Sequence, residues 1–80
     1  MKRASHEDAV VQWDEIPRRL RQIRGGMSQI ELGKALGIRQ NDVSRYETGR
    51  VRPPLGYLVM VAQYGKVSLD WLVTGKKREP

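Results

Sequence analysis

The sequence predicts an all-α fold, a compact five-helix domain with an extra N-terminal helical segment. Three observations support this prediction. Apolar residues recur at the three- and four-residue spacing of amphipathic helices. Serines and glycines stand where such helices should begin and end. Residues 29–49 have the pattern of two short helices joined by a tight turn. With 80 residues, one domain is the expected organisation.

The first 16 residues are expected to form an acidic helical extension ahead of the domain. Ser5 and Asp8 resemble a capped helix start, and apolar residues would share one face: Val10, Trp13 and Ile16 or Pro17. Pro17 suits the first turn of a new helix, so we expect a break or kink there. The domain itself should span residues 17–75, and residues 76–80 should form a disordered tail.

The helix over residues 17–24 should place Leu20 and Ile23 in the core. Its arginines should point mostly outward: Arg18, Arg19, Arg21 and Arg24. The next helix starts after Ser28, which forms the capping-box pattern S-x-x-E with Glu31. The predicted apolar stripe of this helix comprises Ile30, Leu32, Ala35 and Leu36.

Three residues make the pattern over 29–49 more specific than a generic helix pair. Gly33 is small where the two helices would cross, so their backbones can approach closely. Gly37 can adopt the left-handed conformation that a sharp turn requires. Val43 would face back from the second helix toward the first. A bulky side chain at position 33, a β-branched one at 37 or a charge at 43 would each disrupt this packing.

The second helix of the pair should cover residues 40–48 and stop at Gly49. A further helix follows two prolines and ends near Gly65. Its core side chains should be Leu55, Leu58, Val61 and Ala62. Ser68 would cap the last short helix, which Gly75 closes.

These motifs resemble those of the lambda-repressor/Cro-like (XRE-type) helix-turn-helix family. The resemblance covers roughly residues 16–75. It is carried by M-S-Q-I-E-L-G at 27–33, V-S-R-Y-E-T-G at 43–49 and S-L-D-W-L-V-T-G at 68–75. The resemblance implies a five-helix DNA-binding domain of the Cro/C1 type, which regulates transcription and docks its third helix in the major groove of DNA.

Matching the family motif position by position assigns roles in DNA binding. The residues placed toward the groove, as base contacts, are Gln40, Asn41, Ser44 and Arg45. Gln and Asn can pair with adenine, and Arg with guanine, through two hydrogen bonds each. The residues assigned to phosphate contacts flank that helix and are Ser28, Gln29, Arg39, Arg50 and Arg52.

The resemblance also implies a structural pair between a glutamate at position 47 and an arginine on the first domain helix. Arg21 is the candidate partner of Glu47. The chain departs from the family pattern in four places. These are the extra residue at Gly25–Gly26, Arg39 in place of a Ser or Thr cap, Asp42 near the start of the recognition helix, and Lys66 ahead of the last helix. The first departure bears directly on the choice of Arg21.

The charge distribution supports DNA as the partner. The chain has 15 Lys and Arg against 9 Asp and Glu, a formal net charge of +6. Residues 1–16 hold two basic and four acidic groups, so they carry −2 and residues 17–80 carry +8. A basic domain with an acidic arm indicates an anionic partner for the domain. Charge alone would not establish this, since many basic proteins never touch DNA.

Composition disfavours other classes of function. Cysteine is absent, and the single histidine, His6, lies in a polar segment where a solvated side chain is expected. A Gly-rich phosphate loop is missing too, so we expect no enzyme activity, no metal and no cofactor. Few aromatic residues are available to stack on unpaired RNA bases. No run approaches the length of a membrane helix, and the start lacks a signal-peptide apolar core, so we expect a cytoplasmic bacterial or phage protein.

The predicted function is sequence-specific regulation of transcription, as a repressor that binds double-stranded DNA as a homodimer. Two surfaces could form the dimer. One is the N-terminal segment with Val10, Val11 and Trp13, and the other is the Trp71–Val73 end with Val59 or Met60. The alternative is an antitoxin-type or partner-binding regulator with the same fold, in which the acidic N-terminal segment binds another protein.

Overall fold

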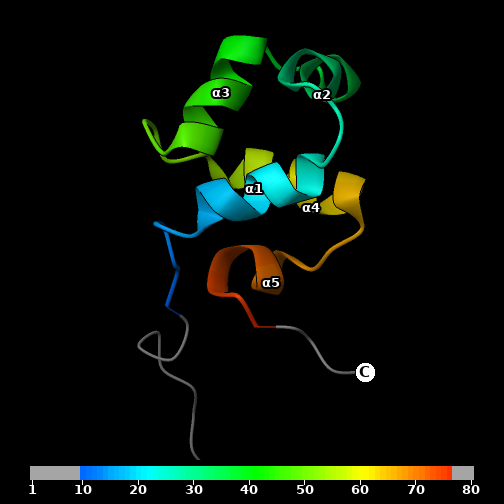
Figure 1. The fold of residues 1–80 in the computed structure, drawn as a ribbon. Helices are drawn as coiled ribbons and strands as arrows, with labels where there is room; N and C mark the ends of the chain where they lie inside the picture. Colours follow the sequence, from blue (N-terminus) through cyan, green and yellow to red (C-terminus); the bar gives the residue numbers. More distant parts are fainter. Residues whose placement is uncertain (1–9, 77–80) are drawn as a thin grey trace, which may run out of the picture.

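The computed structural model describes residues 10–76, and within this range the chain forms five helices and no strand (Figure 1). The helices are α1 (Ile16–Arg24), α2 (Gln29–Leu36), α3 (Gln40–Thr48), α4 (Leu55–Gly65) and α5 (Leu69–Thr74). The predicted all-α, five-helix domain is confirmed.

The hydrophobic core lies where α1, α4 and α5 meet. Its buried members are Ile16, Leu20, Tyr57, Leu58, Val61, Ala62 and Leu72. α1 is central, because it contacts α3, α4 and α5. In Figure 1, α1 and α4 form the middle of the molecule, with α2 and α3 on one side of them and α5 on the other. The helix-turn-helix pair therefore rests on α1 through α3, while α5 closes the opposite side of the core.

Local signals set the helix ends. The Ser28 hydroxyl accepts a hydrogen bond from the Glu31 N–H, and the Glu31 carboxylate accepts one from the Ser28 N–H, so the capping box is complete. Ser68 caps α5 by accepting from the Trp71 N–H at 3.0 Å. α4 ends in Lys66, a left-handed residue with φ 56° at a position where glycine is more usual. The extra residue between the last two helices thus serves as the C-cap of α4.

The segment before α1 differs from its prediction. Residues 10–15 contain a turn and no helix, while Ser5 and Asp8 lie outside the described residues. The Gln12 N–H donates to the Val73 carbonyl at 2.8 Å, and the Arg19 guanidinium donates to the Gln12 side chain. Contacts with α5 and with Arg19 of α1 thus hold this segment in an irregular conformation, and its Gln12 and Trp13 pack against their own domain.

Several burial predictions were wrong. Arg19 is buried instead of outward, since its guanidinium also donates to the Leu72 carbonyl at the end of α5. A cation there is favoured by the helix dipole and by the unpaired carbonyls of the last turn. Ile30 and Ala35 are exposed because α2 packs mainly on α3 and buries only a narrow face. Leu55 is 66% exposed, because Tyr57 takes the core position at the start of α4.

Candidate nucleic-acid interface

The outward face of α3 carries the polar side chains that the motif assigns to base contacts. Gln40, Asn41 and Arg45 are exposed and Ser44 is half-buried. The opposite face is anchored by Val43 and Glu47, both 0% exposed. The helix therefore has one face fixed in the domain and one face of hydrogen-bonding groups directed to solvent.

Backbone contact explains the requirement for glycine in the turn before α3. A Cβ on Gly33 would lie 2.5 Å from the Ile38 carbonyl oxygen, which is closer than real Cβ atoms approach. The Ile38 N–H donates to the Gly33 carbonyl at 2.8 Å across the same contact. Gly37 has φ 73°, in the left-handed region that disfavours a side chain. The tight turn that orients α3 on α2 thus depends on both glycines.

Glu47 joins three helices through its buried carboxylate. Arg24 Nε donates to both carboxylate oxygens, at 2.9 and 3.0 Å, and Gln29 Nε2 donates to one of them at 3.2 Å. The hydrogen bonding of Arg24 to the Glu47 carboxylate raises the pKa of Arg24 above its ordinary value. The arginine predicted for this position, Arg21, instead donates to the backbone carbonyl of Glu47.

Arg24 takes the place expected for Arg21 because of the longer turn. Arg21 and Arg24 are three residues apart and share one face of α1. Arg24 lies in the last turn of α1, nearer to α2, and it also donates to the Met27 carbonyl at 2.6 Å across the Gly25–Gly26 turn. The second arginine therefore reaches the carboxylate, and the first supports the backbone of α3.

A chain of amides links this buried pair to the exposed face of α3. Gln40 Nε2 donates to Gln29 Oε1 at 3.0 Å, and Gln29 Nε2 donates in turn to Glu47. A carboxylate can only accept hydrogen bonds, so Gln29 must turn its NH₂ to Glu47 and its oxygen to Gln40. Gln40 then keeps its own oxygen and one N–H free, which is the donor–acceptor pair that adenine requires.

Arg45 is the other candidate base reader with a partner in the protein. Its guanidinium lies 3.5 Å from Asp42, and both side chains are well exposed. Such a surface pair contributes little to stability, so Arg45 can exchange it for a guanine. Arg45 also lines a shallow hollow of about 360 Å³ together with Asn41, Ser44, Thr48 and Arg50. Thr48 was missed as a neighbour of this face, although its helical spacing from Asn41 and Ser44 could have indicated it.

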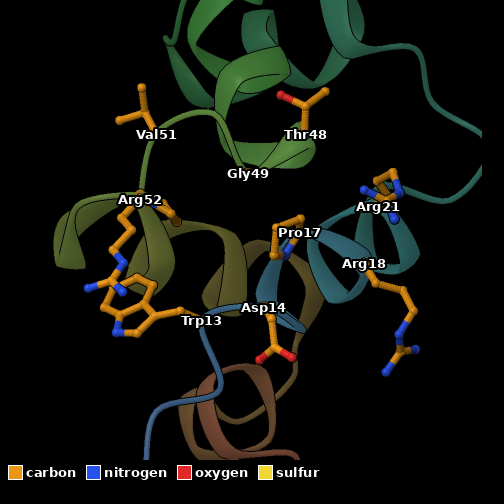
Figure 2. A pocket seen from close by; sticks show the side chains of 10 residues that line it. Trp13, Asp14, Pro17, Arg18, Arg21, Thr48, Gly49, Val51 and Arg52 are labelled. Atoms are coloured by element: carbon orange, nitrogen blue, oxygen red, sulfur yellow. The ribbon is translucent and has the colours of Figure 1, made fainter.

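The residues predicted to contact phosphate lie before and after α3 and at the start of α2, and two of them already make side-chain hydrogen bonds within the protein. Arg39 and Arg50 are exposed, and Arg39 precedes α3 with no side-chain capping bond. The Ser28 hydroxyl is used in its capping box, and the Gln29 side-chain amide is hydrogen-bonded to Glu47 and Gln40. Arg52 stacks on the ring of Trp13 (Figure 2). The backbone N–H groups at the start of α2 remain candidates for phosphate contact.

Within residues 10–76, no group of three or more His, Cys, Asp or Glu side chains could hold a metal ion. No helix in this range is both long and apolar enough to cross a membrane.

Comparison with known proteins identifies the family. The helix-turn-helix family HTH_3, of the XRE/Cro/C1 type, matches residues 18–72, which is more than half of the chain. No curated protein matches the chain significantly, and no solved structure does so either. The matched family is one of DNA-binding domains and not a catalytic family. The chain therefore belongs to the XRE/Cro/C1-type helix-turn-helix family, whose domains bind DNA.

Proposed function

We propose that this protein is a sequence-specific transcriptional repressor that inserts α3 into the major groove of operator DNA. The observation that supports this most is the outward face of α3, where Gln40, Asn41 and Arg45 are exposed above the buried Val43 and Glu47. Their side chains can distinguish base pairs by paired hydrogen bonds. A repressor can act by occupying an operator and blocking polymerase, and with DNA as its partner we expect the protein to act in the cytoplasm.

Phosphate contacts on both sides of α3 would fix its register in the groove. Arg39 precedes the helix, while Arg50 and Arg52 follow it, and all three are exposed. The N-terminal end of α2 adds backbone N–H donors whose dipole favours an anion. Because each phosphate contact releases counterions, binding should weaken steeply as salt is raised.

We further propose that the repressor is a homodimer joined through an apolar groove. This groove, of about 220 Å³, is lined by Val11, Trp13, Leu55, Leu58, Leu69 and Val73. It unites parts of both predicted dimer surfaces, the N-terminal segment and α5, whereas Val59 and Met60 do not line it. The lining comes from no part of α2 or α3. A second copy seated here would leave both recognition helices free, with the exposed Leu55 of each subunit entering the groove of the other.

Selection of bound duplexes from a random DNA pool tests the proposed function. The expected product is an inverted repeat whose half-sites lie about one helical turn, roughly 34 Å, apart. Failure to enrich any motif at low salt would contradict sequence-specific binding. Enrichment of a single half-site would leave specific binding intact and contradict the dimer.

A further inference from the structure

We propose that Trp13 is a positioning residue for DNA binding, because its ring holds the guanidinium of Arg52 ready for a DNA phosphate. This inference rests on the proposed DNA-binding function. It extends the DNA-binding machinery to a residue outside the matched family segment, which begins at residue 18. The segment before α1 would then contribute to the grip on the DNA backbone.

The contact itself is a cation–π interaction. The guanidinium carbon of Arg52 lies 4.7 Å from the centre of the Trp13 ring, within the range of about 6 Å for such pairs. Figure 2 shows the Arg52 side chain running from the loop after α3 to the ring of Trp13. Both residues line a hollow of about 510 Å³ that also reaches Thr48 and Gly49, at the end of the recognition helix. The contact thus lies next to the surface proposed to meet DNA.

Stacking leaves the hydrogen-bond donors of Arg52 available. A guanidinium that lies over an aromatic ring uses its face, and its N–H groups remain in the plane around its edge. Other arginines use their N–H donors in ion pairs with carboxylates, namely Arg18 with Glu15, Arg24 with Glu47 and Arg45 with Asp42. Within residues 10–76, Arg52 makes no hydrogen bond to the protein and no ion pair. Its donors can therefore bind a phosphate without first breaking a hydrogen bond or ion pair to residues 10–76.

Trp13 is held firmly enough to act as a support. Its side chain is half-buried and packs against the hydrophobic core. The preceding residue, Gln12, is fixed to α5 by the 2.8 Å bond from its N–H to the Val73 carbonyl. On the other side of the contact, Arg52 is followed by the buried Pro53, which restricts the loop. Holding a long side chain in place before binding reduces the conformational entropy that the complex would otherwise lose.

A double-mutant cycle tests the proposal. The affinity for a mixed-sequence DNA duplex is measured over a range of salt concentrations for wild type, Trp13→Leu, Arg52→Ala and the double variant. Trp13→Leu should weaken binding roughly two- to fivefold, the worth of an exposed cation–π contact. Arg52→Ala should weaken it more and reduce the salt slope by about one. The double variant should bind as Arg52→Ala does, and Trp13→Tyr should retain most of the affinity.

Two controls separate positioning from folding. Tyr64→Leu alters an exposed aromatic side chain that lines neither the hollow beside Arg52 nor the proposed dimer groove, and it should leave affinity unchanged in protein that still melts cooperatively. If Trp13→Leu does not fold, the emission of Trp13 is followed in a Trp71→Phe background. It should change both on Arg52→Ala and on addition of the duplex.

The outcomes are distinguishable from failure of the proposed function. Wild-type protein that binds no duplex overturns DNA binding and this inference together. Wild-type binding with additive losses in the double variant overturns the inference alone. So does tighter binding by Trp13→Leu, which would mean that the ring withholds Arg52 from DNA. Trp13 emission that responds neither to Arg52→Ala nor to DNA would overturn it as well.

Discussion

Glu47 illustrates how a single residue determines both packing and the recognition surface. Its carboxylate is fully buried, yet it has three hydrogen bonds from Arg24 and Gln29. A buried charge is tolerated only when it is paired and its remaining lone pairs are satisfied. Through Gln29 the same carboxylate sets the orientation of the Gln40 amide at the proposed DNA surface.

Glu47→Gln should destabilise the domain by about 3 kcal/mol. The substitution keeps the shape of the side chain, but it leaves Arg24 half-buried without a counter-charge and turns an NH₂ toward other donors. Urea unfolding followed by circular dichroism measures the change. The matched control is Asp42→Asn, which removes an exposed pair and should alter stability by less than about 1 kcal/mol. Equal small effects of both variants would contradict the structural role of Glu47.

Tyr57 makes the domain sensitive to alkali. Its hydroxyl is buried and has no hydrogen-bond partner within residues 10–76. Burial raises the pKa of Tyr57 to about 12, whereas an unfolded tyrosine ionises near ~10. The folded state therefore holds the proton more tightly. The stability that the domain gains from keeping Tyr57 protonated is complete below pH ~10 and is lost as pH rises toward 12.

Tyr57→Phe should stabilise the domain by about 1 kcal/mol at neutral pH, because it removes an unsatisfied buried hydroxyl. It should also reduce the loss of stability between pH ~10 and ~12 by about 2 kcal/mol. Unfolding free energies of both proteins across this range provide the measurement. Tyr64→Phe, at an exposed position, is the control. Parallel pH profiles for wild type and Tyr57→Phe would show that another group governs alkaline unfolding.

Single-residue roles were predictable where the signal is local. Ser28 and Glu31 form the capping box that their spacing indicates, and Val43 is buried as its place in the motif requires. Arg19 and Arg24 were not predictable in this way. Arg19 binds a carbonyl 53 residues away, and Arg24 replaces Arg21 only because of the path of the turn after α1. Such contacts depend on how helices pack, which spacing along one helix does not contain.

At the scale of elements, the α2–turn–α3 unit depends on close backbone contact. The backbone around Gly33 and Ile38 leaves no room for a Cβ, and the neighbour is a carbonyl that cannot rotate away. α2 has little other support, since it packs mainly on α3. The orientation of the recognition helix on α2 thus depends on the absence of a side chain at position 33.

Gly33→Ala should destabilise the domain by roughly 1–3 kcal/mol, because the added methyl overpacks the turn. It should weaken DNA binding as well, since α3 must shift. Gly56→Ala is the matched control. It lies in α4 with no atom within 4 Å of the added Cβ, and it should stabilise the helix by about 0.5–1 kcal/mol. If thermal melting shows that both substitutions stabilise, the account of the turn is wrong.

Element boundaries were largely predictable from caps and stop signals. α3 covers residues 40–48 as predicted, and α5 begins after Ser68. The prediction was wrong for residues 10–15, where apolar spacing suggested a helix but bonds to α5 hold an irregular segment. It was also wrong about which face of α4 is buried at Leu55. That helix is apolar nearly all round, so only tertiary packing selects its inner face.

For the whole molecule, the proposed dimer depends on an apolar groove away from the recognition helix. Leu55→Glu places a charge at its rim and should shift the protein to monomer at micromolar concentration, measured by sedimentation. The fold should be retained, because Leu55 is 66% exposed. Met60→Glu, on the same helix outside the groove, should leave assembly unchanged. Dissociation by Met60→Glu alone would assign the dimer to the surface predicted at the Trp71–Val73 end together with Met60.

The fold class and the family could be predicted from the sequence, because the motifs, the capping residues and the charge distribution all indicated the same DNA-binding domain. Assembly was not, since it depends on which apolar side chains remain exposed after folding. No pattern in the sequence joins Val11 and Trp13 with Leu69 and Val73, yet the structure brings them together in one groove. Likewise, Arg52 was predicted as a phosphate contact, but its stacking on Trp13 could not be foreseen across 39 residues of chain.

The proposal that the exposed face of α3 reads base edges is tested most directly with a substitution profile of the selected operator. Affinity is measured for wild type and Arg45→Ala on every single-base-pair variant of one half-site. Wild type should lose ~1–3 kcal/mol at each contacted position, and Arg45→Ala should lose its preference at one base pair while keeping the others. Two profiles that run parallel at every position would contradict a reading role for Arg45 and for the helix face that carries it.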